Sequence, residues 1–325
     1  MTPEEMEKFI VRYSDLKPCK TAFIDAHTPG SDQKENFTII GGGVSESRDQ
    51  HVHINETPGF NIGAAGQPPG CKNSLHTHTT AEVFYVLKGS WRFFWGRYGE
   101  DGELFANEGD LVNIPTGIFR AFENVGDGYG MLMAILGGDD AGGGVTWAPE
   151  VINDAKDFGL VLGDNGVLYD TKKGELLPEH IAPMQLLTDE ELKNFPKVTT
   201  EVFMSNFFVS ASDLSHHSKD TPLKVIGANG LLKDKPGFEV DFISNETFVD
   251  EMHSPSQYEV NMVMRGEWTL EWDGNSTRIS AGDTCLIRPD LSYKMTPIGL
   301  DEASLFKVTK TNDPAGSTWR ELFNL

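Results

Sequence analysis

The stretch that decides the fold is HTHTTAEVFYVLKG, residues 76–89. It places two histidines two positions apart, a glutamate four positions later, and then a run of aromatic and branched residues that ends in glycine. Residues two apart in a strand face the same side, so a continuous strand would direct His76, His78 and Glu82 into one interior. Two imidazoles and one carboxylate on one face form a donor set that holds non-haem Fe(II) while leaving positions open. The stretch predicts a β strand with metal ligands directed inward.

The second half of the chain repeats this pattern. VLKGSWRFFWG at 86–96 is matched by VMRGEWTLEWDG at 263–274. An identical residue stands 177 positions after each of His76, Glu82, Gly89, Trp91 and Trp95. EGDLVNIPTG at 108–117 pairs with AGDTCLIRPD at 281–290 at the shorter offset of 173, so one loop of the second copy lacks four residues. A period this long is the size of a domain and indicates a duplicated domain.

Each copy consists of short runs of Val, Ile, Phe, Tyr and Trp broken by Gly, Asp, Asn and Pro, which predicts an all-β fold of two barrels. Short helices are expected outside the barrels, near Pro3 and in 148–159 and 187–195. The predicted domains are an N-terminal segment with a short helix (1–50), a first barrel (51–138), a connection with short helices (139–215), and a second barrel with a C-terminal tail (216–325).

The spacing of several Gly, His, Glu, Pro and Asn residues resembles the motifs of the cupin superfamily. Its first motif is fitted by Gly70, His76, His78, Glu82 and Gly89, and its second by Gly109, Pro115, Gly117 and Asn124. With the degenerate second copy, the chain resembles a bicupin, and the resemblance implies two double-stranded β-helix (jelly-roll) barrels. Among bicupins it is most similar to ring-cleaving dioxygenases of the quercetinase and hydroquinone dioxygenase kind. Hydroquinone-cleaving relatives carry iron in the C-terminal barrel, whereas this sequence has its more complete ligand set in the N-terminal one.

The second motif departs from the family at Arg120, which stands where a histidine ligand is expected. Arginine offers no lone pair, so Arg120 cannot be a fourth ligand. In one interpretation, His76, His78 and Glu82 hold the metal while Arg120 acts in catalysis on an anionic ligand, since a cation beside a dication needs an anion between them. In the other, Arg120 pairs with Glu82 and replaces the metal.

The second copy has a poorer ligand set. At the equivalent positions it carries His253, Pro255, Glu259 and Tyr293. Proline has no donor atom for a metal, and a histidine, a carboxylate and a phenol make a weak site. We expect His253, Glu259 and Tyr293 to form a degenerate site in a structural barrel, and a substrate pocket without metal stays an alternative.

Aromatic residues are frequent around the first motif. Phe84, Phe93 and Phe122 are candidates to contact an aromatic substrate, although barrel interiors are filled by such side chains in any case. As a set they favour an apolar pocket suited to a ring.

The composition limits the partners. The net charge of −22 disfavours binding to nucleic acid or an anionic membrane. The three cysteines are scattered, no export signal or membrane-spanning run is evident, and a cytoplasmic location is expected. The expected partner is a small aromatic or anionic substrate, with a homo-oligomer as a further possibility.

The leading functional hypothesis is a metal-dependent oxygenase, a non-haem dioxygenase that uses Fe(II) on a phenolic or anionic small molecule. Two alternatives stay open. One is a metal-free bicupin that binds a small molecule and pairs Glu82 with Arg120. The other is an isomerase or lyase in which Mn, Ni or Zn acts as a Lewis acid.

Overall fold

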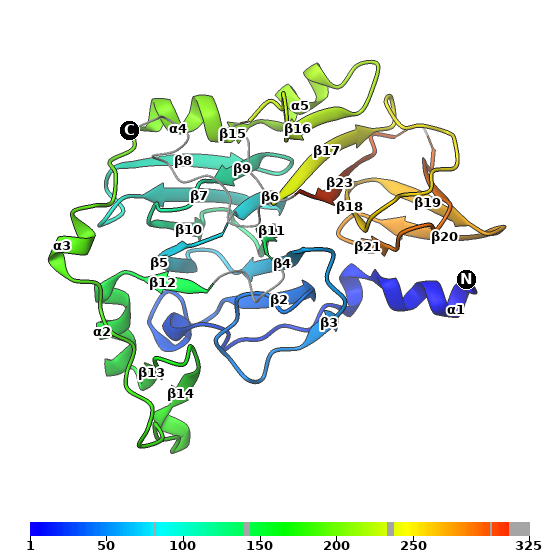
Figure 1. The fold of residues 1–325 in the computed structure, drawn as a ribbon. Helices are drawn as coiled ribbons and strands as arrows, with labels where there is room; N and C mark the ends of the chain where they lie inside the picture. The colour runs from blue at the N-terminus through cyan, green and yellow to red at the C-terminus, as the bar shows by residue number, and fades with distance from the viewer. Residues whose placement is uncertain (81, 139–143, 233–236, 300, 312–325) are drawn as a thin grey trace.

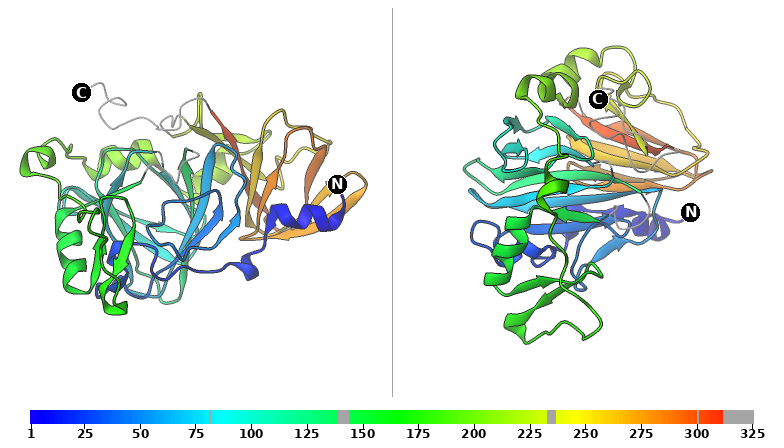
Figure 2. Two further views of the ribbon diagram at one scale, coloured as in Figure 1. Left: turned by 60° about the horizontal axis from the view of Figure 1, so that its bottom comes forward. Right: turned by 60° about the vertical axis from the view of Figure 1, so that its left-hand side comes forward.

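The computed structural model describes residues 1–80, 82–138, 144–232, 237–299 and 301–311 of the 325-residue chain. Most of the described elements are strands, arranged as two barrels that lie side by side (Figures 1 and 2). Within these ranges no helix has the length and apolar character of a membrane span. The predicted all-β fold of two barrels with a few short outer helices is confirmed.

The first barrel is formed by two facing sheets (Figure 1). The seven-stranded sheet contains, in spatial order, β15 (Phe208–Val209), β9 (Leu111–Ile114), β6 (Glu82–Lys88), β11 (Gly130–Gly137), β4 (Phe60–Gln67), β2 (Glu35–Ile40) and β3 (Val52–Ile54). The five-stranded sheet contains β12 (Val145–Trp147), β5 (Lys72–His78), β10 (Arg120–Asn124), β7 (Ser90–Trp95) and β8 (Gly102–Asn107). All pairs in these two sheets are antiparallel except the edge pair of β2 with β3.

The second barrel is smaller and repeats this plan. Its six-stranded sheet contains β1 (Ile10–Val11), β21 (Thr284–Ile287), β18 (Glu259–Arg265), β23 (Ser304–Lys310), β17 (Phe238–Ser244) and β16 (Leu223–Ile226). Its three-stranded sheet contains β20 (Asn275–Ser280), β19 (Glu267–Trp272) and β22 (Tyr293–Pro297). A separate ribbon pairs β13 (Leu160–Leu162) with β14 (Leu168–Asp170).

The duplication seen in the sequence is a duplication of strands. β7 and β19 bury every second residue in the same phase, and the four tryptophans of the repeat are all within 1% of complete burial. The missing four residues lie in the next hairpin, where 96–101 join β7 to β8 but only 273–274 join β19 to β20. Asp273 and Gly274 have φ of 46° and 77°, as a two-residue Asp-Gly hairpin turn requires.

The two barrels pack through the outer faces of their larger sheets. Tyr85 of β6 lies against Phe306 of β23, with ring centroids 5.1 Å apart, and Phe60 of β4 lies 6.1 Å from Phe238 of β17. These rings belong to one continuous apolar cluster that contains residues of both barrels. The contact between barrels is therefore itself a hydrophobic core.

The helices lie outside the barrels, as predicted (Figures 1 and 2). They are α1 (Pro3–Met6), α2 (Pro149–Asp157), α3 (Asp189–Leu192), α4 (Thr200–Phe207) and α5 (Ala211–His217), together with the 3₁₀ turns η1 (Glu7–Phe9), η2 (Tyr13–Asp15), η3 (Ile24–His27) and η5 (Thr171–Lys173). Capping boxes start α1, from Thr2 to Glu5, and α3, from Thr188 to Glu191.

The segments expected outside the barrels also complete their sheets. β2, from the N-terminal 50 residues, pairs with β4 of the first barrel, and β1 pairs with β21 of the second. β12 and β15, from the connection, extend the edges at β5 and β9. Pairing of this kind satisfies the N–H and C=O groups that an edge strand would leave open.

Candidate metal site in the first barrel

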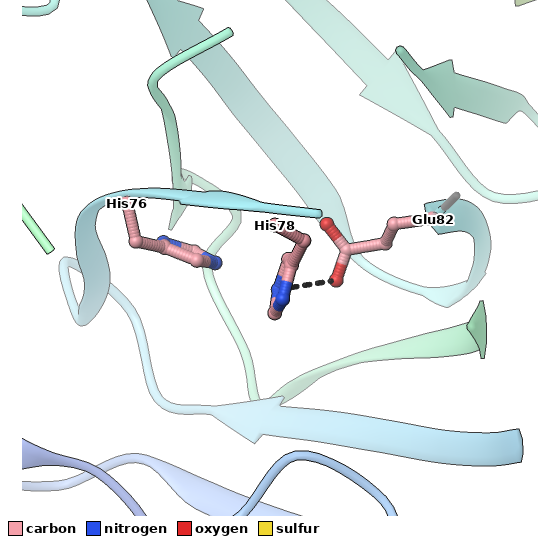
Figure 3. Close-up of side chains that lie close together, drawn as sticks. All are labelled: His76, His78 and Glu82. Atoms are coloured by element: carbon pink, nitrogen blue, oxygen red, sulfur yellow. Dashed lines mark ion pairs between the residues drawn. The ribbon is translucent and has the colours of Figure 1, made fainter. Parts of the chain in front are cut away.

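Three side chains with metal-ligand chemistry meet inside the first barrel. One ligand atom from each of His76, His78 and Glu82 lies within 4.8 Å of the other two, and all three residues are buried (Figure 3). The expectation of one continuous strand is wrong, because β5 ends at His78 and β6 begins at Glu82 in the facing sheet. The histidines come from one sheet and the carboxylate from the other, so the group lies between the two.

Backbone carbonyls fix the orientation of both imidazoles. His76 Nδ1 lies 2.7 Å from the carbonyl oxygen of Ser74, and His78 Nδ1 lies 3.0 Å from that of Gly144. A carbonyl oxygen only accepts, so we assign the ring proton to Nδ1 and the free lone pair to Nε2. Burial, and then the charge of Arg120, lower the pKa of both rings. Both therefore stay neutral near pH 7, the form that binds a metal.

Glu82 divides its carboxylate between two neighbours. Its Oε1 lies 3.5 Å from His78 Nε2 (Figure 3), whereas Oε2 accepts hydrogen bonds from Arg120, through Nε at 3.0 Å and through Nη2. Burial alone would raise the pKa of Glu82, but Arg120 and the two histidines outweigh it and hold the pKa well below its usual value. The carboxylate is ionised whether or not a metal is bound.

Arg120 lies behind Glu82. It is 2% exposed, sits opposite His76 in the pairing of β10 with β5, and donates through Nη1 to the His76 carbonyl oxygen at 3.1 Å. Its guanidinium thus joins the strand that carries the histidines to the strand that carries Glu82. The salt bridge between Arg120 and Glu82, which the sequence predicts if arginine replaces the metal, is present. The other carboxylate oxygen, Glu82 Oε1, lies on the side of the histidines.

A cavity of about 60 Å³ opens in front of the group. Its wall includes His76, His78, Glu82, Phe84, Phe122, Asn73, Ala134 and Leu136 from the barrel strands, and Phe23, Asn36, Phe37, Thr38 and Val44 from the N-terminal segment. Of the predicted substrate contacts, Phe84 and Phe122 reach this wall, and Phe93 packs behind them with ring centroids 5.5 and 5.9 Å away.

Sequence reasoning missed two residues that support the histidines. The Trp147 ring lies 5.1 Å from the His76 ring, and its Nε1 donates to Glu46 Oε1 at 2.6 Å. Glu46 Oε2 accepts from the Ile24 backbone N–H at 2.9 Å, and burial raises the pKa of Glu46 to about 8. Trp147 lies in the segment 139–215, which the sequence predicts to be a connection between domains. Nothing around Glu46 in the sequence distinguishes it from a surface carboxylate.

A buried ion pair braces the start of β5. Lys34 Nζ pairs with Asp25 Oδ1 and donates to Asn73 Oδ1 at 2.8 Å. The other oxygen of Asp25 accepts from the Ser74 N–H at 3.0 Å. The N-terminal segment therefore holds the strand that carries the histidines as well as forming part of the cavity wall.

The degenerate residues of the second barrel also come together. Glu259 Oε2 accepts from the Tyr293 hydroxyl at 2.6 Å, and Oε1 lies 3.2 Å from His253 Nε2. Burial and Glu259 raise the pKa of Tyr293 well above its usual value, so the phenol stays neutral. Across the described ranges, only the first-barrel group gathers three histidine, cysteine or acidic side chains at metal-binding distances.

The donor set of the first barrel fits a divalent metal ion. Two neutral imidazoles with free Nε2 atoms and one ionised carboxylate oxygen are the ligands that Fe(II), Mn(II) and Zn(II) accept. The backbone bonds at both Nδ1 atoms are the outer contacts that orient metal-binding histidines.

Two family models match the chain, one in each barrel. Residues 66–136 match the Cupin domain, and residues 236–323 match the AraC-like ligand binding domain. No curated protein sequence gives a significant match.

Solved structures of similar fold are bicupins in the same arrangement. A variant of the Bacillus subtilis oxalate decarboxylase has 15% sequence identity and a TM-score of 0.52, with 96% of this chain and 79% of that chain covered. The oxalate decarboxylase of Lactobacillus farciminis, in a complex with formate, has 13% identity and a TM-score of 0.54, covering 97% of this chain and 90% of its own. At 13% and 15% sequence identity, these similarities show the fold alone. The chain has the bicupin fold.

Proposed function

We propose that the first barrel is a metal-dependent catalytic site for a small anionic molecule. The observation that carries the proposal is the convergence of His76, His78 and Glu82 on a small cavity, in the protonation states that a metal requires. These three residues would hold the ion. When bound, it would supply Lewis-acid chemistry and, for a redox metal, reaction with dioxygen.

The Arg120 salt bridge is compatible with a metal because Glu82 has two oxygens. Arg120 takes Oε2, and Oε1 lies on the side of His78. A carboxylate can bridge a guanidinium and a metal in this way, with the guanidinium fixing its orientation. In this proposal Arg120 is a positioning residue, and Glu82 would ligate through one oxygen.

The charges of the site favour an anionic substrate. A divalent ion beside Arg120 carries more positive charge than Glu82 alone can balance, and burial makes an unbalanced charge costly. A substrate carboxylate or phenolate would restore the balance. The cavity of about 60 Å³ favours a compact molecule over a polycyclic one. Phe84 and Phe122 would exclude water from it, and Asn36 and Asn73 supply polar groups to orient it.

Two reaction classes fit this description. A lyase acting on a small carboxylate is supported by the small cavity and by the fold shared with oxalate decarboxylases, for one of which Mn(II) centres are described. A dioxygenase with Fe(II) acting on a small phenolic acid is supported by Phe84 and Phe122 on the wall. Mn(II) is the metal we propose for the first class and Fe(II) for the second, with Ni or Zn as further Lewis acids.

Reconstitution with single metals separates the classes. The protein is loaded with Mn(II) or with Fe(II) and given oxalate, malonate, hydroquinone or 4-hydroxybenzoate, while CO₂ release and O₂ uptake are recorded. CO₂ release from a small acid without net O₂ consumption supports the lyase, and stoichiometric O₂ uptake with a phenol supports the dioxygenase. Glu82→Gln is the control and should abolish either activity. A wild-type protein that takes up no metal would contradict the proposal and favour the metal-free binding module.

A cytoplasmic location and a homo-oligomeric state of the protein stay predictions.

A further inference from the structure

The second barrel contains a larger cavity than the metal site. Its volume is about 290 Å³, against about 60 Å³ in front of His76 and His78. The cavity opens beside the degenerate ligand positions and is lined by His253, Asn261 and Tyr293. The barrel that lacks a metal-binding group among the described residues thus has the space for a larger ligand.

One part of this cavity is apolar. Ile243, Phe248, Met295 and Leu305 are among the residues that line it. Met252 stands at the rim with 50% of its surface exposed. A wall of this kind suits the hydrocarbon body of a ligand.

The polar part of the cavity presents a cation. Lys307 lines the cavity, is 25% exposed, and lies 3.9 Å from Glu259 Oε1, beyond hydrogen-bond distance. Glu259 already receives Tyr293 on one oxygen and faces His253 on the other. Within the described part of the chain, Lys307 has no closer acidic partner, so its ammonium has donors left for a ligand.

The other lysine of the cavity is already neutralised. Lys294 Nζ lies 2.8 Å from Asp250 Oδ1 and 3.5 Å from Glu271 Oε1. Glu251 stands exposed at the rim and would repel an anion only at the entrance. Of the two lysines that line the cavity, Lys307 is therefore the more loosely paired, at 3.9 Å from Glu259 Oε1.

We propose that the second barrel binds an organic monocarboxylic acid without a metal, with the carboxylate on Lys307 and the apolar body against Phe248 and Leu305. The site is independent of the proposed activity of the first barrel, from which it is separated by the apolar contact between the larger sheets. It binds a bulkier acid than the small metal-site cavity accepts.

The test is titration calorimetry of the full-length protein with phenylacetate and, as the uncharged match, phenylacetamide. We expect phenylacetate to bind and phenylacetamide to bind at least about tenfold more weakly, the loss expected for one charge-assisted hydrogen bond. Lys307→Met should weaken phenylacetate by a similar factor. Arg278→Met is the matched control, because it removes one positive charge from an exposed position on the same barrel and should leave binding unchanged.

Two further variants keep the test decisive. Met252→Trp, at the exposed rim, should obstruct the cavity and weaken phenylacetate even if Lys307→Met folds poorly. The double variant His76→Ala, His78→Ala should bind phenylacetate like wild type. Equal binding of acid and amide, loss of binding in the histidine variant, or no binding of phenylacetate to wild type would each overturn the proposal.

Discussion

Arg120 and Glu82 are each buried and each depends on the other for its charge. Arg120 is 2% exposed and Glu82 is 5% exposed, and the guanidinium holds Oε2 of the carboxylate through two donors. Removing one member of a buried pair leaves the other uncompensated, which costs about 3–5 kcal/mol. A metal on Oε1 would replace part of the lost positive charge.

Arg120→Met should therefore lower the free energy of unfolding of metal-free protein by about 3–5 kcal/mol, and added Mn(II) should recover much of this loss. Urea unfolding with and without Mn(II) measures both quantities. Arg92→Met, which breaks a partly exposed pair with Glu103 on the neighbouring strands, should cost less than about 1 kcal/mol with no metal dependence. A destabilisation of Arg120→Met that Mn(II) leaves unchanged would argue that the metal does not reach Glu82.

Glu46 should give the fold a pH dependence opposite to that of an ordinary carboxylate. Burial raises the pKa of Glu46 from 4.5 to about 8. Between these two pH values the folded state holds a proton that the unfolded state has released. Its stabilising contribution is fully present below about pH 4.5 and is lost as the pH rises through about 8.

Glu46→Gln keeps a neutral side chain at every pH. We expect the stability of wild type relative to this variant to fall as the pH is raised from 5 to 9, measured by urea unfolding at fixed ionic strength. Glu190→Gln, on the exposed face of α3, should run parallel to wild type. Parallel curves for Glu46→Gln as well would mean that Glu46 is ionised throughout.

Among the elements, the turn before β7 is constrained at Gly89. Gly89 has φ of 90°, and a Cβ at this position would lie 3.1 Å from the Gly130 Cα. Both the left-handed backbone and the close strand oppose a side chain there, which explains a glycine at the same place in both copies.

Gly89→Ala should destabilise the protein by about 1–3 kcal/mol, seen as a lower urea midpoint with an unchanged slope. Gly128→Ala is the matched control in the adjoining loop, since a Cβ at Gly128 meets nothing within 4 Å. Its effect should stay within about 0.5 kcal/mol. A similar loss in both variants would point to general sensitivity of this hairpin region in place of the conformation of Gly89.

Elements also show where sequence reasoning succeeds and where it stops. The two barrels follow from the repeated glycines and tryptophans, because alternation along β7 and β19 is a local property of each strand. The shortened hairpin at 273–274 is likewise visible as an offset of four residues. Glu46 and Trp147 are not visible, because they reach the site through contacts between distant segments that carry no periodic pattern.

At the scale of the whole molecule, the two barrels have a similar arrangement of strands and differ in the side chains and cavities inside them. The first gathers two histidines and a carboxylate in front of a small cavity, and the second keeps one histidine, one carboxylate and a phenol beside a large one. The sequence shows this difference in side chains directly, and that the first group binds a metal stays a prediction. The sequence could not predict the difference in cavity size, because the wall of the first cavity includes residues of the N-terminal segment, which are distant in sequence from the strands of the barrel.

The measurement that tests the central claim most directly is the metal content of protein purified without chelator or nickel affinity resin, compared with the double variant His76→Ala, His78→Ala. We predict close to one Mn or Fe per chain in the wild type and its loss in the variant, with Arg120→Met retaining the metal. A wild type that holds no metal, and takes up none from added Mn(II) or Fe(II), would contradict the account and leave Arg120 as the sole counter-ion of Glu82.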